Sequence, residues 1–121
     1  MRLFALRGAT TVTANDADAI LVATEELMRE IMARNELAAE DLVSCIFTLT
    51  EDLDAQFPAV AARNMGLSAV PLLCAREVPV PGALPRVIRV LIHCYAAAEH
   101  SPQHVYLGEA VALRLDLAGA Q

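Results

Sequence analysis

The chain has 121 residues, which is enough for one domain with a substantial hydrophobic core and too few for two. Its net charge of −6 and its few aromatic residues argue against nucleic-acid binding, which favours a basic surface and stacking rings. Hydrophobic residues make up 56% of the chain, yet no apolar run approaches the roughly eighteen residues that span a membrane. We therefore expect the excess apolar surface to lie between the subunits of a homo-oligomer.

The N-terminal residues do not form the apolar stretch of a signal peptide, because Arg7 and Asp16 interrupt it, and we expect a cytoplasmic protein. Three cysteines, Cys45, Cys74 and Cys94, are odd in number and lack Cys-x-x-Cys spacing. This pattern indicates neither a disulfide framework nor a metal site. Cys45 and Cys94 fall within apolar strand patterns and are expected in the core, whereas the pattern around Cys74 leaves its place open.

The first predicted element is a strand over residues 3–8 that ends with Arg7 and Gly8, and residues 8–12 are expected to turn the chain away from it. Asn15 or Asp16 can cap the next element, a helix over about 16–35 whose apolar residues recur at helical spacing. Residues 42–50 are β-rich and apolar on both faces, which favours a buried strand. Pro58 suits the first turn of a short helix that runs to about residue 65.

In the second half, a short strand is predicted over 70–74, and a proline-rich connection over 78–85 leads into a strand over 87–95. An extended segment follows at 105–107, and a tail from about 115 to 121 is expected to be mobile. This order of strands and helices predicts an α+β fold in a single domain, 1–121, with helices on one face of a mixed sheet.

Arg89 is anomalous, because it lies between Ile88 and Val90 in an apolar strand and an unpaired guanidinium is very costly to bury. Arg7 ends the first strand in a similar way. A ligand with two carboxylates would satisfy both arginines, since guanidinium groups bind carboxylates in a planar, bidentate manner. An internal salt bridge, for instance between Arg89 and Glu77, would serve equally well, and the pattern alone does not decide between them.

Six segments in one order and spacing point to a specific family. They are Arg7–Val12, Phe57–Ala59 with Arg63, Cys74 with Glu77, Ile88–Val90, His104–Leu107 and Ala110–Arg114. Together they resemble the monofunctional chorismate mutases of the AroH class, over nearly the whole chain. The resemblance implies a homotrimer like the Bacillus-type enzymes, with mixed sheets packed into a pseudo-α/β barrel and active sites at the interfaces between chains.

The resemblance also implies the reaction. Chorismate, a dianion, rearranges to prephenate in phenylalanine and tyrosine biosynthesis, by an intramolecular Claisen rearrangement. The reaction transfers no proton and forms no covalent enzyme intermediate, so it needs neither a metal nor a cofactor. For the same reason His93, His100 and His104 are interpreted as structural or solvated residues.

A role for each site residue follows from the resemblance. Arg89 would donate to the ether oxygen and the side-chain carboxylate, Arg7 and Tyr106 would hold that carboxylate, and Glu77 and Cys74 would meet the ring hydroxyl. Further substrate contacts are expected from Phe57, Ala59, Arg63 and Leu73, and from a closing C-terminal segment with Leu113 and Arg114. The first three of these would come from the neighbouring chain.

Each role has a plainer alternative. Cys74 could be an inert buried thiol, Tyr106 a packing residue, and Arg63 and Arg114 ordinary surface charges. The chain also departs from the family pattern: Val60 replaces the usual lysine after Phe-Pro-Ala, which removes a positive charge near the mouth of the site.

Leu73 replaces the family's threonine before the cysteine. Two other functions remain as alternatives: a trimeric imine or enamine deaminase of similar fold, whose own motifs are absent here, and a non-catalytic sensor that binds a dianion.

Overall fold

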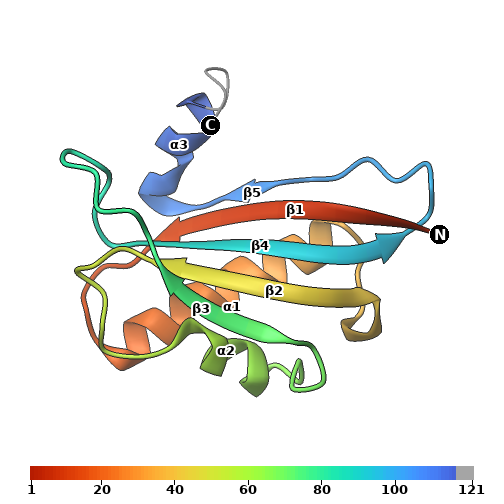
Figure 1. The fold of residues 1–121 in the computed structure, drawn as a ribbon, viewed down its shortest axis with the longest axis horizontal. Helices are drawn as coiled ribbons and strands as arrows, with labels where there is room; N and C mark the ends of the chain where they lie inside the picture. The colour runs from red at the N-terminus through yellow and green to blue at the C-terminus, as the bar shows by residue number, and fades with distance from the viewer. Residues whose placement is uncertain (117–121) are drawn as a thin grey trace.

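The structure, a computed structural model, describes residues 1–116, the last three by their backbone alone. Five strands form one sheet in the order β3-β2-β4-β1-β5, with α1 and α2 behind it (Figure 1). The elements are β1 (Arg2–Thr11), α1 (Ala17–Arg34), β2 (Leu42–Leu49), α2 (Pro58–Asn64), β3 (Leu72–Arg76), β4 (Val87–Ala96), β5 (Val105–Tyr106) and α3 (Val111–Asp116). The predicted mixed sheet with helices on one face is confirmed.

Strand pairing fixes which side chains share a face. β4 lies between β1 and β2 and is antiparallel to both, whereas β3 and β5 are added in parallel at the two edges. Arg89 on β4 lies opposite Thr48 on β2, and Arg7 on β1 lies opposite Leu91 on β4. Because side chains alternate along a strand, Arg7 and Arg89 lie on the face turned away from α1.

The helix side of the sheet carries the core. Leu6, Phe47 and Ile92 are fully buried there against Leu27 and other residues of α1. Gly8 permits the close approach of this helix, since a Cβ atom at Gly8 would lie 2.5 Å from Cδ1 of Ile31. The glycine after Arg7 therefore serves packing, while the arginine serves the other face.

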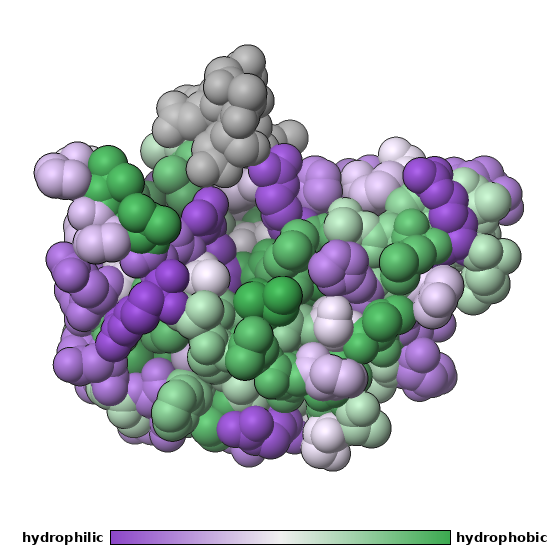
Figure 2. All heavy atoms as spheres, viewed as in Figure 1, coloured by the Kyte–Doolittle hydropathy of each residue, from purple (hydrophilic) through white to green (hydrophobic). Residues whose placement is uncertain are grey.

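The opposite face is left uncovered by α1 and α2 and is largely hydrophobic at its centre (Figure 2). Ile46 and Leu91 are half-buried near the middle of this face, while Leu3, Leu73 and Tyr95 are 48%, 60% and 48% exposed. A contiguous apolar surface of this kind is typical of a protein–protein interface. No helix within residues 1–116 is long and apolar enough to cross a membrane.

The predicted elements match the observed ones with three differences. β1 continues to Thr11, where the sequence predicts a turn from Gly8 onward, because residues 8–11 pair with residues 87–90 of β4. β3 begins two residues later than predicted, and the helix α3 over Val111–Asp116 was not predicted. Of the tail expected to be mobile, residues 117–121 lie outside the described part of the chain.

Candidate active site

Arg89 and Glu77 form a bidentate ion pair on the open face of the sheet. Nε and Nη2 of Arg89 donate to the two carboxylate oxygens of Glu77, each at 2.7 Å. The Glu77 backbone N–H donates to the carbonyl of Leu49, which holds the residue beside β2 just after β3 ends. The salt bridge that the sequence left as an alternative is thus present, with the two side chains 38% and 14% exposed.

The environment keeps both groups charged. Burial would raise the pKa of Glu77, but hydrogen bonds from Arg89 and Thr48, with the charge of Arg89, lower it below its usual value. The hydrogen bonds to Glu77 raise the pKa of Arg89, against the effect of its own burial. At neutral pH the site therefore holds a carboxylate and a guanidinium side by side.

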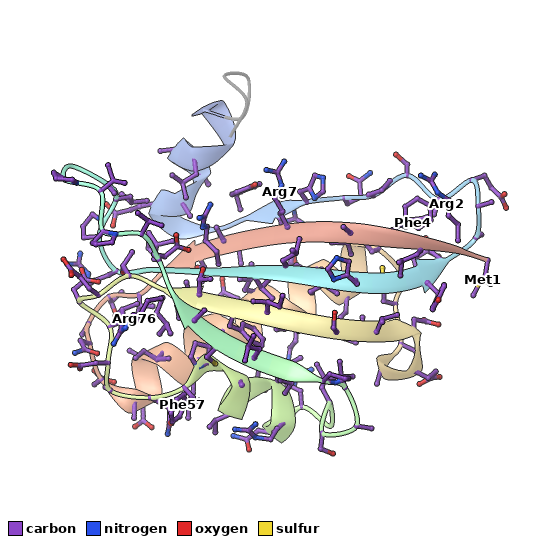
Figure 3. All side chains as sticks on the ribbon, in the orientation of Figure 1. Met1, Arg2, Phe4, Arg7, Phe57 and Arg76 are labelled. Carbon is purple, nitrogen blue, oxygen red and sulfur yellow. The ribbon has the colours of Figure 1, made fainter. Side chains whose placement is uncertain are left out.

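A cavity of about 250 Å³ adjoins this pair and contains the other predicted cation. Its polar lining comes from Arg7, Thr48, Arg89 and Tyr106, and its apolar lining from Gly8, Ile46, Val90 and Leu91. Arg7 lies on the side of the sheet where β1 meets β5 (Figure 3). Arg7, Arg89 and Tyr106 come from three neighbouring strands, so the sheet itself brings them together.

The remaining predicted residues gather elsewhere. Phe57, Ala59, Arg63, Leu73 and Cys74 line a separate surface hollow of about 310 Å³ between α2 and β3. Phe57, which precedes α2, is 64% exposed. Figure 3 shows Arg7 and Phe57 near opposite edges of the sheet, Arg7 beside β1 and β5 and Phe57 beyond β3. One chain therefore carries two separate groups of predicted site residues, which we call the arginine half-site and the Phe57 half-site.

Cys74 belongs to the Phe57 half-site and is not brought beside Glu77 in the same chain. It pairs with the buried Phe47 across β2 and β3 and packs against the core on the helix side of the sheet. Glu77, by contrast, contacts Thr48 on the open face. Cys45 and Cys94 are buried, as predicted, and burial raises the pKa of the Cys45 thiol to about 12.

Leu113 lies near the ion pair, in a further hollow of about 280 Å³ lined also by Glu77, Val80, Leu84 and Arg89. The turn before α3 is anchored at Gly108. Its φ of 57° is unfavourable for residues with a side chain, and a Cβ atom at this position would lie 2.6 Å from Oγ1 of Thr11. The backbone of α3 carries Arg114 next to Leu113, and the Arg114 side chain lies outside the description.

The three histidines make hydrogen bonds within the protein. Nδ1 of His104 accepts from the backbone N–H of Arg7 at 3.0 Å, and burial and the charge of Arg7 lower the pKa of His104. His93 pairs with Ser44, and His100 pairs with Asn35. Among the side chains that the structure describes, those of residues 1–113, no group of three His, Cys, Asp or Glu is placed to hold a metal ion.

One residue at the site, Thr48, was not identified from the sequence. Its Oγ1 donates to Oε2 of Glu77, the oxygen that also accepts from Nε of Arg89. The alternation along residues 42–50 places Thr48 on one face, but its position opposite Arg89 depends on the register between β2 and β4. That register cannot be obtained from either strand alone.

The comparisons with known proteins agree on one family. The family model described as chorismate mutase type I matches residues 3–117. A chorismate mutase AroH from Thermus thermophilus is 52% identical over 118 residues, which are 96% of this chain and 97% of that protein. A second chorismate mutase AroH, from Bacillus subtilis, is 38% identical over 98% of this chain and 94% of that protein. The solved structure of a chorismate mutase from Clostridium thermocellum, 46% identical, superposes with a TM-score of 0.88 over 90% of this chain and 98% of that chain.

Proposed function

This chain belongs to the chorismate mutase type I family, and we propose that it converts chorismate to prephenate around Arg89 on the open face of the sheet. The observation that carries the proposal is the placement of Arg89. One edge of its guanidinium is paired with Glu77, and the side chain lines the cavity that also contains Arg7 and Tyr106. A dianionic substrate fits such a pair of arginines.

The rearrangement requires the protein to position the substrate and to stabilise the charge that develops in the transition state. A carbon–oxygen bond of the ether breaks as a carbon–carbon bond forms, and no proton moves. An acceleration of about 10⁶-fold requires roughly 8 kcal/mol of transition-state stabilisation. Holding the enolpyruvyl side chain over the ring supplies part of it, and stabilising the charge that separates supplies the rest.

Arg89 acts on the developing negative charge in this proposal. Glu77 occupies one edge of the guanidinium, so the N–H groups on the other edge are available to the ether oxygen and the side-chain carboxylate. Arg7 and Tyr106, in the same cavity, hold that carboxylate. The ether oxygen is more negative in the transition state than in the substrate. The interaction with Arg89 is therefore stronger in the transition state than in the bound substrate, and it accelerates the reaction.

Glu77 plays a double role in the proposal. Its carboxylate accepts a hydrogen bond from the ring hydroxyl and faces a ring that becomes more positive as the ether bond stretches. The pKa of Glu77, lowered by its hydrogen bonds, keeps the negative charge in place at neutral pH. Arg89 and Glu77 therefore stabilise the two ends of one separating charge.

We further propose a homotrimer in which the Phe57 half-site of one chain completes the arginine half-site of its neighbour, within a pseudo-α/β barrel. The exposure of Phe57 and Leu73, at 64% and 60%, supports this arrangement. Cyclic head-to-tail contacts place two different surfaces of the chain against each other. Cys74 would then approach the ring hydroxyl from the neighbouring chain, together with Ala59 and Arg63.

The segment with Leu113 and Arg114 closes over the substrate in this proposal, supported by the place of Leu113 near Glu77 and Arg89. The reaction uses no cofactor or metal, because its electrons rearrange within the substrate. We also propose that the enzyme acts in the cytoplasm.

The test is to mix the purified protein with chorismate and follow the loss of its ring-diene absorbance, with prephenate confirmed by acid conversion to phenylpyruvate. We expect rapid turnover, and in Arg89→Ala a fall in kcat of about 10²- to 10³-fold. Affinity for substrate should fall much less. Binding of chorismate without turnover by the wild-type protein would instead favour a dianion sensor.

A further inference from the structure

Thr48 lies beside the two charged residues of the site, and the roles proposed above make no use of it. On β2 it stands opposite Arg89 of β4 on one side and Ala75 of β3 on the other. Its hydroxyl donates to Oε2 of Glu77, which also accepts from Nε of Arg89. Thr48 lines the same cavity as Arg7 and Tyr106.

These contacts leave the Glu77 carboxylate little freedom. Oε1 accepts from Nη2 of Arg89 and Oε2 accepts from both Arg89 and Thr48. An arginine–carboxylate fork on its own can swing as a unit, since both side chains are long. The Thr48 hydroxyl is a third point of attachment from a different strand, on a β-branched side chain with few rotamers.

We propose that Thr48 is a positioning residue for the rearrangement: it holds the Glu77 carboxylate, and through it the Arg89 guanidinium, in the orientation that faces the substrate. This inference rests on the proposed function. Thr48 does not need to touch the reacting atoms, because its effect passes through the oxygen that it shares with Arg89.

The same hydrogen bond has an electrostatic consequence. Burial acts to raise the pKa of Glu77, while the bonds from Arg89 and Thr48 act to lower it. Removal of the Thr48 hydroxyl takes away one of the lowering effects, so the pKa of Glu77 rises. A carboxyl with a higher pKa is protonated at a higher pH, and the acidic limb of kcat/KM should move in that direction.

The experiment compares Thr48→Val, which keeps the shape but loses the hydroxyl, with Thr48→Ser, which keeps the hydroxyl. For Thr48→Val we expect kcat to fall about tenfold with KM changed less than about threefold, and the acidic limb to move up by about one pH unit. Thr48→Ser should stay close to the wild-type profile. Thr24→Val is the matched control, since the Thr24 hydroxyl also donates a hydrogen bond, in this case to the carbonyl of Ile20 within α1.

A second measurement does not depend on turnover. Titration of the Glu77 carboxyl carbon by NMR, without substrate, should give a higher pKa in Thr48→Val than in the wild type, Thr48→Ser or Thr24→Val. Thr48→Ala replaces Thr48→Val in both measurements if the valine variant does not fold. If the wild type turns over chorismate but Thr48→Val shows neither a shifted pH profile nor a shifted Glu77 titration, the role of Thr48 is overturned and the proposed function stands. A wild type without turnover would overturn the proposed function, and with it any positioning role in that reaction.

Discussion

At the scale of single residues, Arg89 can bind Glu77 and the substrate at the same time. The sequence presents an internal salt bridge and an external dianion as alternatives, because an arginine in an apolar strand requires a negative partner. In the structure Glu77 engages Nε and Nη2, which form one edge of a group with five N–H donors. A guanidinium held on one edge is preorganised to donate from the other.

Replacement of Cys74 tests whether its sulfur is required for the reaction. We predict that Cys74→Ser keeps kcat within about threefold of the wild type, because a hydroxyl can replace the thiol as a hydrogen-bonding group. The measurement is the chorismate assay on the purified variant. An inactive variant, combined with stoichiometric and substrate-protected alkylation of Cys74, would require a covalent mechanism.

Cys45→Ala is the matched control for alkylation. The Cys45 thiol of the wild type is buried, and burial raises its pKa to about 12, so this thiol should resist modification at neutral pH in the folded protein. Loss of labelling in Cys74→Ser but not in Cys45→Ala would assign the reactive thiol.

Beyond the residues that the family resemblance supplies, the sequence pattern itself singles out those whose local surroundings are unusual. Arg7 and Arg89 are charges within apolar strands, and that contradiction is visible in a few residues of sequence. Thr48 is an ordinary residue in a strand, and its importance comes from a register that places it opposite Arg89. Cys74 and Glu77 are three apart, and the alternation along β3 puts them on opposite faces.

At the scale of elements, periodicity predicted α1, β2, α2 and β4 to within about two residues. α3 was missed because its short sequence has no strong helical pattern, and the turn before it is anchored by the distant Thr11, whose Oγ1 accepts from the backbone N–H of Glu109 at 3.0 Å. Contacts of that range are absent from any local window of sequence.

Asn35 links two elements and provides the element-scale prediction. At the end of α1 it is 2% exposed, and its side chain bonds to Ile31, His100 and both backbone groups of Gln103. We predict that Asn35→Ala lowers the free energy of unfolding by about 2–4 kcal/mol, because several buried polar groups lose their partner at once. Chemical denaturation measures the change.

Gln103→Ala is the control for this prediction, since it keeps the backbone groups that bond to Asn35 and removes an exposed side chain. It should change stability by less than about 0.5 kcal/mol. Equal effects of the two substitutions would show that the Asn35 side chain does not hold the connection between β4 and β5.

At the scale of the whole molecule, one chain contains all the proposed site residues but does not bring them together. The arginine half-site lies across the open face, and the Phe57 half-site lies between α2 and β3. The apolar centre of the open face would give the neighbouring chains of the proposed trimer a surface on which to pack (Figure 2). Composition predicts an oligomer and the family resemblance implies a site shared between chains, while the placement of Cys74 beside Phe57 instead of Glu77 required the structure.

The central claim is that each active site is shared between two chains, and complementation tests it most directly. Arg89→Ala disables one half-site, and a Phe57→Ala, Arg63→Ala double variant disables the other, so each protein alone should be nearly inactive. In a trimer that contains both variants, one of the three interfaces combines the two intact half-sites. Co-expression in equal amounts should therefore restore about a quarter of the wild-type chorismate turnover, since three quarters of randomly assembled trimers are mixed. Mixed trimers, verified by mass spectrometry, that show no recovered activity would contradict the shared site.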